Sequence, residues 1–114
     1  MRHRKLNMDT NARKALFSNL TNAVLTHEQI KITVQRAKEL RTFVDKMITY
    51  GKKGDLVARR KALSFLRNDT VAVKKVFDEL APKYAKRDGG YTNIVKLDER
   101  RGDDALMVVL SLVE

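Results

Sequence analysis

One apolar stripe constrains this 114-residue chain more than any other feature, because residues 33–51 repeat apolar side chains at helical spacing. The stripe consists of Ala37, Leu40, Phe43, Val44, Met47 and Ile48. Such a stripe marks a helix that buries one face against a core, and Thr33 is a residue type that caps a helix at its start. The rest of the chain must therefore supply elements that cover this helix.

Three further segments show helical spacing. A first helix is expected over about residues 12–26. Another follows Gly54 with Asp55 as its cap, and a last one begins near Asp69 and should end ahead of Pro82, the only proline. The residues expected to face the core in these last two helices are Leu56, Ala62, Leu63, Leu66, Val73, Val76, Phe77 and Leu80.

Strand signals appear between the first two helices and again at the end of the chain. Residues 30–34 alternate apolar and polar side chains, and residues 91–97 and 105–113 form two strand-like runs joined by a loop over 98–104. Asp88, Gly89 and Gly90 mark a tight turn ahead of the hairpin. We therefore expect one α+β domain: about four helices packed on a small mixed sheet of about three strands, with residues 10–114 globular and 1–9 a flexible basic arm.

The net charge of +10 is concentrated in two segments. Residues 1–14 carry +4 and residues 31–67 carry +8, whereas residues 68–104 are neutral. A basic surface of this strength favours polyanions, because each cation that neutralises a phosphate releases condensed counterions. Nucleic acid is the leading partner. An anionic membrane is the competing one, but no segment combines a basic face with the bulky apolar face of a membrane-surface helix.

Several classes of function lack their usual signals. The chain has no cysteine, no apolar run near the roughly 20 residues of a membrane span, no secretory apolar segment and no phosphate-binding glycine loop. Its serines lack the glycine-flanked turn of a nucleophile. We expect a cytoplasmic protein without cofactor, metal or small-molecule substrate.

The candidate nucleic-acid contacts form two groups. The arm and the start of the first helix supply Arg2, His3, Arg4, Lys5, Arg13 and Lys14. The second group lies on two helices and the 51–54 turn expected between them: Arg36, Lys38, Arg41, Lys52, Lys53, Arg59, Arg60 and Lys61. Within it, Lys38, Arg41 and Lys52 are predicted to form a basic row opposite the apolar stripe.

Two alternatives from other classes stay open. A free-standing DNA- or RNA-binding regulator would show the same basic surface. A metal-dependent nuclease could use the hairpin-loop acids, which are Asp98, Glu99, Asp103 and Asp104. One loop gives poor geometry for a two-metal site, and charge balance with Arg100 and Arg101 explains these acids better.

Several motifs, in order along the whole chain, resemble those of one family. They are MRHRKL at 1–6, RAKELR at 36–41, KKGDL at 52–56, RDGGYT at 87–92, RRGDDA at 100–105 and LV at 112–113. Together they resemble the bacterial large-subunit ribosomal protein L-seventeen family. The resemblance implies an α+β structural component that binds the long ribosomal RNA near the mouth of the peptide exit tunnel, beside other large-subunit proteins, without catalysing a reaction.

The resemblance also extends the set of expected RNA contacts to the turns near Arg87, Tyr91, Arg100 and Arg101. Tyr91 and His3 are possible stacking groups for bases. The chain departs from the usual family pattern at Asn7, Met8, Asn93, Glu99 and Leu106.

Overall fold

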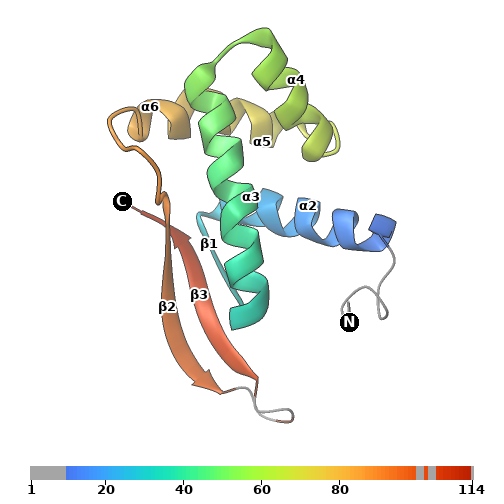
Figure 1. The fold of residues 1–114 in the computed structure, drawn as a ribbon, viewed down its shortest axis with the longest axis vertical. Helices are drawn as coiled ribbons and strands as arrows, with labels where there is room; N and C mark the ends of the chain where they lie inside the picture. Colours follow the sequence, from blue (N-terminus) through green and yellow to red (C-terminus); the bar gives the residue numbers. More distant parts are fainter. Residues whose placement is uncertain (1–9, 100–101, 103–104, 114) are drawn as a thin grey trace.

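The computed structural model describes residues 10–99, 102 and 105–113, and its centre is one long helix (Figure 1). The elements in chain order are α2 (Thr10–His27), β1 (Gln29–Thr33), α3 (Val34–Lys53), α4 (Leu56–Phe65), α5 (Thr70–Lys75), the π-helical turn η1 (Val76–Leu80), α6 (Ala81–Lys83), β2 (Thr92–Glu99) and β3 (Leu106–Leu112). Helices α4, α5 and α6 gather at one end of α3, and α2 and the sheet lie toward the other end (Figure 1). The expected α+β class is confirmed.

The sheet has three strands in the order β1-β3-β2 and is antiparallel throughout. Leu110 of β3 pairs with Ile30 on one side and with Ile94 on the other. The expectation of a mixed sheet is wrong. Strands β1 and β2 run in the same direction, so a mixed sheet would need them to be neighbours, but β3 lies between them.

The predicted apolar stripe of α3 forms the middle of the core. Leu40, Val44 and Ile48 are fully buried and belong to one cluster with Val24 of α2 and Leu110 of β3. Burying each such side chain stabilises the fold by roughly 1.5–3 kcal/mol. The stripe therefore holds α2 and the sheet against the same helix.

Helix α3 runs past the point where the sequence analysis expected a turn. Gly51 lies within the helix, and Gly54 ends it with a left-handed backbone (φ 69°), donating its N–H to the Tyr50 carbonyl at 3.0 Å. A Cβ on Gly51 would come within 2.9 Å of Val76, so Gly51 permits close helix packing and is not a turn residue. The Lys52 and Lys53 side chains consequently belong to the last helical turn, where cations suit the helix dipole.

Pro82 does not stop the last helix, contrary to expectation. Helical structure continues from α5 through η1 into α6, and Pro82 is near the start of α6. In an α-helix a proline ring clashes with the carbonyl four residues earlier. Here the Ala81 N–H bonds to the carbonyl of Val76, five residues back, and this wider π turn lies directly before the proline.

The helix starts differ in how they are capped. Asp55 and Asp69 accept hydrogen bonds from the backbone of Ala58 and Ala72, at 2.7 and 3.1 Å. Thr33 occupies the predicted capping position of α3, but its side chain makes no capping hydrogen bond.

Leu56, which the sequence analysis placed in the core, is 61% exposed. The buried line of α4 instead follows Ala58, Ala62 and Leu66 at four-residue spacing. Leu56 is two residues from Ala58, a rotation of roughly 200°, and therefore lies on the opposite face.

Candidate nucleic-acid interface

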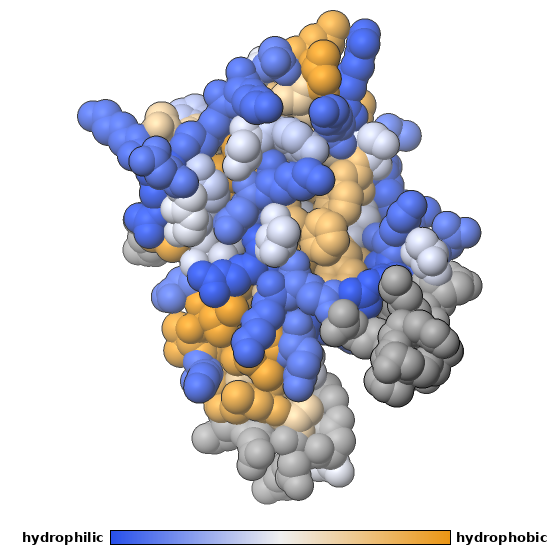
Figure 2. Space-filling view, in the orientation of Figure 1, coloured by the Kyte–Doolittle hydropathy of each residue, from blue (hydrophilic) through white to orange (hydrophobic). Residues whose placement is uncertain are grey.

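Most of the predicted contact residues on α2, α3 and α4 are exposed to solvent. They are Lys14, Arg36, Lys38, Arg41, Lys53, Arg59, Arg60 and Lys61, together with Arg87 ahead of β2. Figure 2 shows hydrophilic side chains over much of the visible face. The structure therefore leaves the excess positive charge of residues 31–67 largely on the surface.

The three acids of the same segment have structural roles. Glu39 forms an ion pair with Arg13, and Asp55 caps α4. Asp45 is half-buried on α3, where burial raises its pKa above the ordinary value despite a hydrogen bond from the Tyr91 backbone and the nearby charge of Arg41. Each of the three acids therefore has a role within the fold, and the eleven bases of residues 31–67 still exceed them by eight charges.

Arg13 is less available than the sequence analysis assumed. It pairs with Glu39 of α3, and its guanidinium carbon lies 4.9 Å from the centre of the Phe17 ring. This contact ties α2 to α3, since the paired residues are 26 positions apart. Arg13 therefore supports the helix that carries Lys14 more directly than it presents a charge of its own.

Lys52 and Tyr91 also depart from expectation. Lys52 is half-buried, and its Nζ donates to the Arg87 carbonyl and, at 2.9 Å, to the Tyr91 hydroxyl. The Tyr91 ring is only 3% exposed and lies 5.3 Å from the ring of Tyr84. A buried ring offers no open face to a base, so the assignment of Tyr91 as a stacking group is corrected. The hydrogen bonds from Lys52 instead tie the end of α3 to the turn before β2.

Two other arginines keep an exposed charge while the fold restrains them. The Arg59 guanidinium carbon lies 4.5 Å from the centre of the Phe77 ring, a cation–π contact that holds the exposed arginine against the domain. Arg87 donates from Nε to the Gly90 carbonyl at 3.1 Å. Restraint of this kind lowers the entropy lost when a side chain binds a partner.

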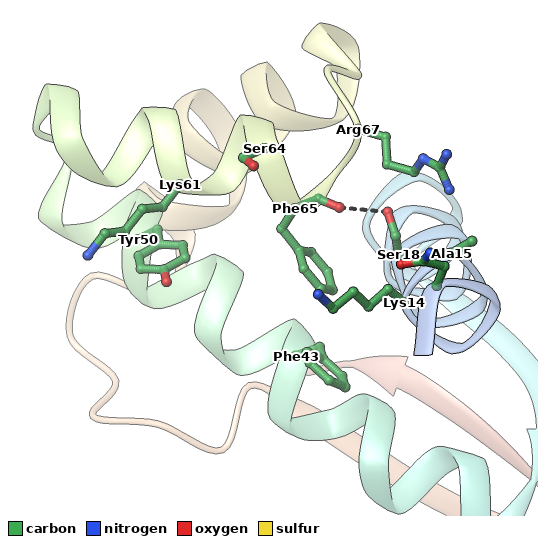
Figure 3. Close-up of a pocket in the computed structure, with 10 residues that line it drawn as sticks. Lys14, Ala15, Ser18, Phe43, Tyr50, Lys61, Ser64, Phe65 and Arg67 are labelled. Carbon is green, nitrogen blue, oxygen red and sulfur yellow. Dashed lines mark hydrogen bonds between the residues drawn. The ribbon is translucent and has the colours of Figure 1, made fainter. Parts of the chain in front are cut away.

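The structure also shows a pocket of about 800 Å³ between α2, α3 and α4 that the sequence analysis did not foresee. Figure 3 shows Phe43 and Phe65 near its centre, Lys61 and Tyr50 at one end, and Lys14 and Arg67 on the side of α2. Ser18 fixes this wall by donating to the Phe65 carbonyl at 2.6 Å. Aromatic surface and cations therefore meet in one hollow.

The spacing of aromatic residues on α3 contains part of the information that predicts this pocket. Phe43 and Tyr50 are seven residues apart, which puts the two aromatic side chains that α3 gives to the pocket on one helix face. Phe43 belongs to the predicted apolar stripe, but its side chain is only half-buried. No local pattern indicated Arg67, because its position depends on the turn after α4.

Some predicted contacts lie outside the described residues: Arg2, His3, Arg4, Lys5, Arg100 and Arg101. Asp103 and Asp104 lie outside them as well. Within residues 10–99, 102 and 105–113, no group of three or more acidic or histidine side chains is placed to hold a metal ion. Over the same residues, no helix is long and apolar enough to span a membrane.

Comparison with known proteins gives one consistent result. The family model described as ribosomal protein L17 matches residues 16–113. A large ribosomal subunit protein bL17 of Clostridium acetobutylicum is 54% identical over 97% of this chain and 96% of its own. Proteins of the same name from Ligilactobacillus salivarius and Paramagnetospirillum magneticum are 50% and 52% identical over the whole of this chain, covering 100% and 84% of their own lengths.

Proposed function

The chain belongs to the ribosomal protein L17 family, a structural and non-enzymatic constituent of the ribosome, and we propose that it acts there by binding large-subunit RNA near the exit of the peptide tunnel. The nuclease alternative is set aside, since the family is not enzymatic. The proposal also includes contacts with neighbouring large-subunit proteins and a cytoplasmic location, both of which follow the role of the related proteins.

The distribution of charge carries the proposal of RNA binding. The bases of α3 and α4 are largely exposed. Of the three acids in this segment, Glu39 forms an ion pair, Asp45 is half-buried and Asp55 caps a helix. A solvated helix face usually interleaves both signs of charge, so this separation favours a polyanionic partner.

The proposed mechanism is positional. Folded RNA brings phosphates close together, and cations fixed on rigid helices neutralise them in one arrangement. Exposed side chains of α3 and α4, such as Lys38 and Arg60, are held by helices that share one core. A-form helices present phosphates and a shallow groove, so we expect recognition of backbone shape more than of base sequence. The protein would thereby favour one packing of RNA segments during subunit assembly.

Co-sedimentation tests the proposed function. Tagged protein is followed through a lysate gradient, with and without a high-salt wash. We expect stoichiometric migration with the large subunit that resists the wash. Migration at the top of the gradient, or loss from the subunit at modest salt, would contradict the proposal and favour the free-standing regulator. In that case tight, sequence-selective binding to an isolated duplex should be found.

A further inference from the structure

The pocket between α2, α3 and α4 joins an aromatic floor to a basic rim. We propose that it receives one unpaired nucleotide of the RNA, with the base against Phe65 at the end of the aromatic stack and the adjoining phosphates at the cations of the rim, Lys14, Lys61 and Arg67. This inference rests on the proposed RNA binding and assigns a specific site to it.

The floor of the pocket is a short aromatic stack. The rings of Phe43 and Phe65 are nearly parallel, with an interplanar angle of 15° and centres 5.3 Å apart. Phe17 lies behind Phe43, with ring centres 5.5 Å apart. Phe17 is buried, whereas Phe43 and Phe65 are half-buried. Phe43 therefore contacts both other rings, and Phe65 ends the stack with apolar surface toward the pocket. Stacking on such rings is how proteins hold unstacked bases.

The rim determines which apolar partner fits. Lys14, Lys61 and Arg67 are exposed and line the same hollow from α2, α4 and the turn after α4. In Figure 3, Lys14 extends toward Phe65, whereas Lys61 and Arg67 lie at opposite ends of the pocket. No acid is among the described residues that line it. A hydrophobic protein segment would gain nothing from three cations, whereas a nucleotide carries an apolar base face and phosphates together. Figure 2 shows an apolar strip bordered by hydrophilic side chains between α2 and α4.

The backbone at the rim adds an independent observation. Arg67 and Asn68 both have left-handed conformations, with φ of 58° and 64°. This is uncommon for residues other than glycine and costs free energy that the surroundings must offset. Hydrogen bonds from Arg67 N–H to the Ser64 carbonyl at 3.2 Å and from Asn68 N–H to the Leu63 carbonyl at 2.8 Å hold the turn. The turn places the Arg67 side chain above Ser18, on the α2 wall of the pocket (Figure 3).

The size and polarity of the pocket favour a single unpaired nucleotide over a duplex. Its volume of about 800 Å³ is within the usual range for small ligands. Bases inside a duplex are stacked on each other and cannot reach a recessed floor, whereas a bulged base can. The hydroxyls of Tyr50 and Ser64 line the same pocket and supply hydrogen-bonding groups for a base edge.

Two RNA hairpins provide the test. They are identical except that one contains an extra unpaired 2-aminopurine nucleotide, whose fluorescence falls when it stacks. Full-length protein is titrated with each hairpin at one salt concentration. We expect the bulged hairpin to bind about tenfold tighter, with quenched fluorescence, because stacking of one base on aromatic side chains gives an effect of this order.

Variants locate the effect in the pocket. Phe65→Leu keeps an apolar side chain but removes the stacking surface, so it should abolish the preference for the bulged hairpin. Phe77→Leu is the matched control, because Phe77 is also half-buried but does not line this pocket. It should retain the preference at a similar melting temperature. If Phe65→Leu does not fold, the double variant Lys14→Gln with Lys61→Gln is tested in its place. This double variant should lower affinity for the bulged hairpin more than for the paired one.

The outcomes separate this inference from the proposed function. Equal affinity of wild-type protein for the two hairpins, or a preference that survives in the pocket variants, would overturn the nucleotide site and leave RNA binding intact. Failure to bind either hairpin, at a salt concentration where basic proteins bind RNA, would contradict both proposals.

Discussion

Gly51 of α3 lies so close to Val76 of η1 that a Cβ on Gly51 would be 2.9 Å from Val76 Cγ1 and 3.1 Å from the Val76 carbonyl oxygen. The same Cβ would be 3.1 Å from Ala81. Backbone atoms cannot yield as the end of a flexible side chain can. The missing side chain at Gly51 is therefore what allows the last helical segment to pack on α3.

Gly51→Ala should destabilise the protein although alanine favours helices. Helix preference alone predicts that alanine raises the free energy of unfolding by up to about 1 kcal/mol, whereas overpacking lowers it by roughly 1–3 kcal/mol. We expect a net loss of about 1 kcal/mol in the free energy of unfolding, measured by urea denaturation. Lys46→Ala, at an exposed site of the same helix, is the control and should change stability by less than about 0.5 kcal/mol. An unchanged or higher midpoint for Gly51→Ala would show that α3 and η1 can separate without cost.

Asp69 should contribute to stability in a pH-dependent way. It caps α5 and accepts a hydrogen bond from Asn22 of α2 at 2.6 Å, and both contacts lower its pKa, the Asn22 contact more strongly. A lowered pKa means that the stabilisation is complete above the ordinary aspartate value of 3.8 and is lost as the pH falls through the folded-state pKa. Asp69→Ala should cost about 1 kcal/mol at pH 7. The deficit, followed by thermal melts, should shrink in acid.

Asp69→Asn is the matched control for that experiment, because asparagine also caps helices but does not titrate. It should retain most of the stability at pH 7 and lose the acid dependence. A deficit of Asp69→Ala that stays constant down to pH 2 would contradict the assigned role of the carboxylate.

Asp45 should behave in the opposite sense. Burial raises its pKa, so the folded protein binds this proton more tightly than the unfolded chain, and stability decreases as the pH rises from 3.8 through the folded-state pKa. Asp45→Asn should therefore gain stability relative to wild type as the pH increases toward 7. Parallel denaturation curves at pH 3 and pH 7 measure the change. A variant that is less stable than wild type at pH 7 would mean that the Arg41 charge and the Tyr91 backbone bond outweigh burial.

The exposed bases of α4 should set part of the salt dependence of RNA binding. Arg60→Gln with Lys61→Gln should reduce the slope of log affinity against log salt concentration by about 1–2, because each lost phosphate contact removes roughly one unit. Lys74→Gln with Lys83→Gln removes the same charge from exposed sites in the neutral part of the chain and should leave the slope nearly unchanged. Equal effects from both double variants would indicate attraction by net charge alone.

The basic arm gives a separate prediction. Replacing Arg2, Arg4 and Lys5 with alanine should weaken incorporation into the large subunit without lowering the melting temperature. Gradient sedimentation and thermal melts measure the two quantities. A variant with Lys74, Lys83 and Lys86 all replaced by alanine is the control, because it removes the same number of charges. A large fall in melting temperature would show that the arm packs on the domain and contributes to its stability.

The sequence by itself determined the elements and the charge of this protein. The spacing of Leu40, Val44 and Ile48 predicts the central helix because apolar residues at that period fall on one side, whatever covers them. Asp55 and Asp69 predict two helix starts, since capping depends on neighbouring backbone groups. The uneven charge likewise indicated a nucleic-acid partner, and the family motifs indicated a ribosomal role, before any contact between elements was known.

Only the tertiary structure decided which of these residues face solvent and which face each other. The hydrogen bond between Lys52 and the buried Tyr91 joins residues 39 positions apart. The ion pair between Arg13 and Glu39 joins residues 26 positions apart. The pocket likewise needs three helices to meet around Phe43 and Phe65. Local spacing encodes the orientation of a side chain about its own helix, whereas the partner it meets depends on how helices dock. Docking is a property of the whole core, and for that reason the turn predicted at Gly51 is wrong. The stop predicted at Pro82 is wrong because a π turn lies directly before the proline and the helix continues.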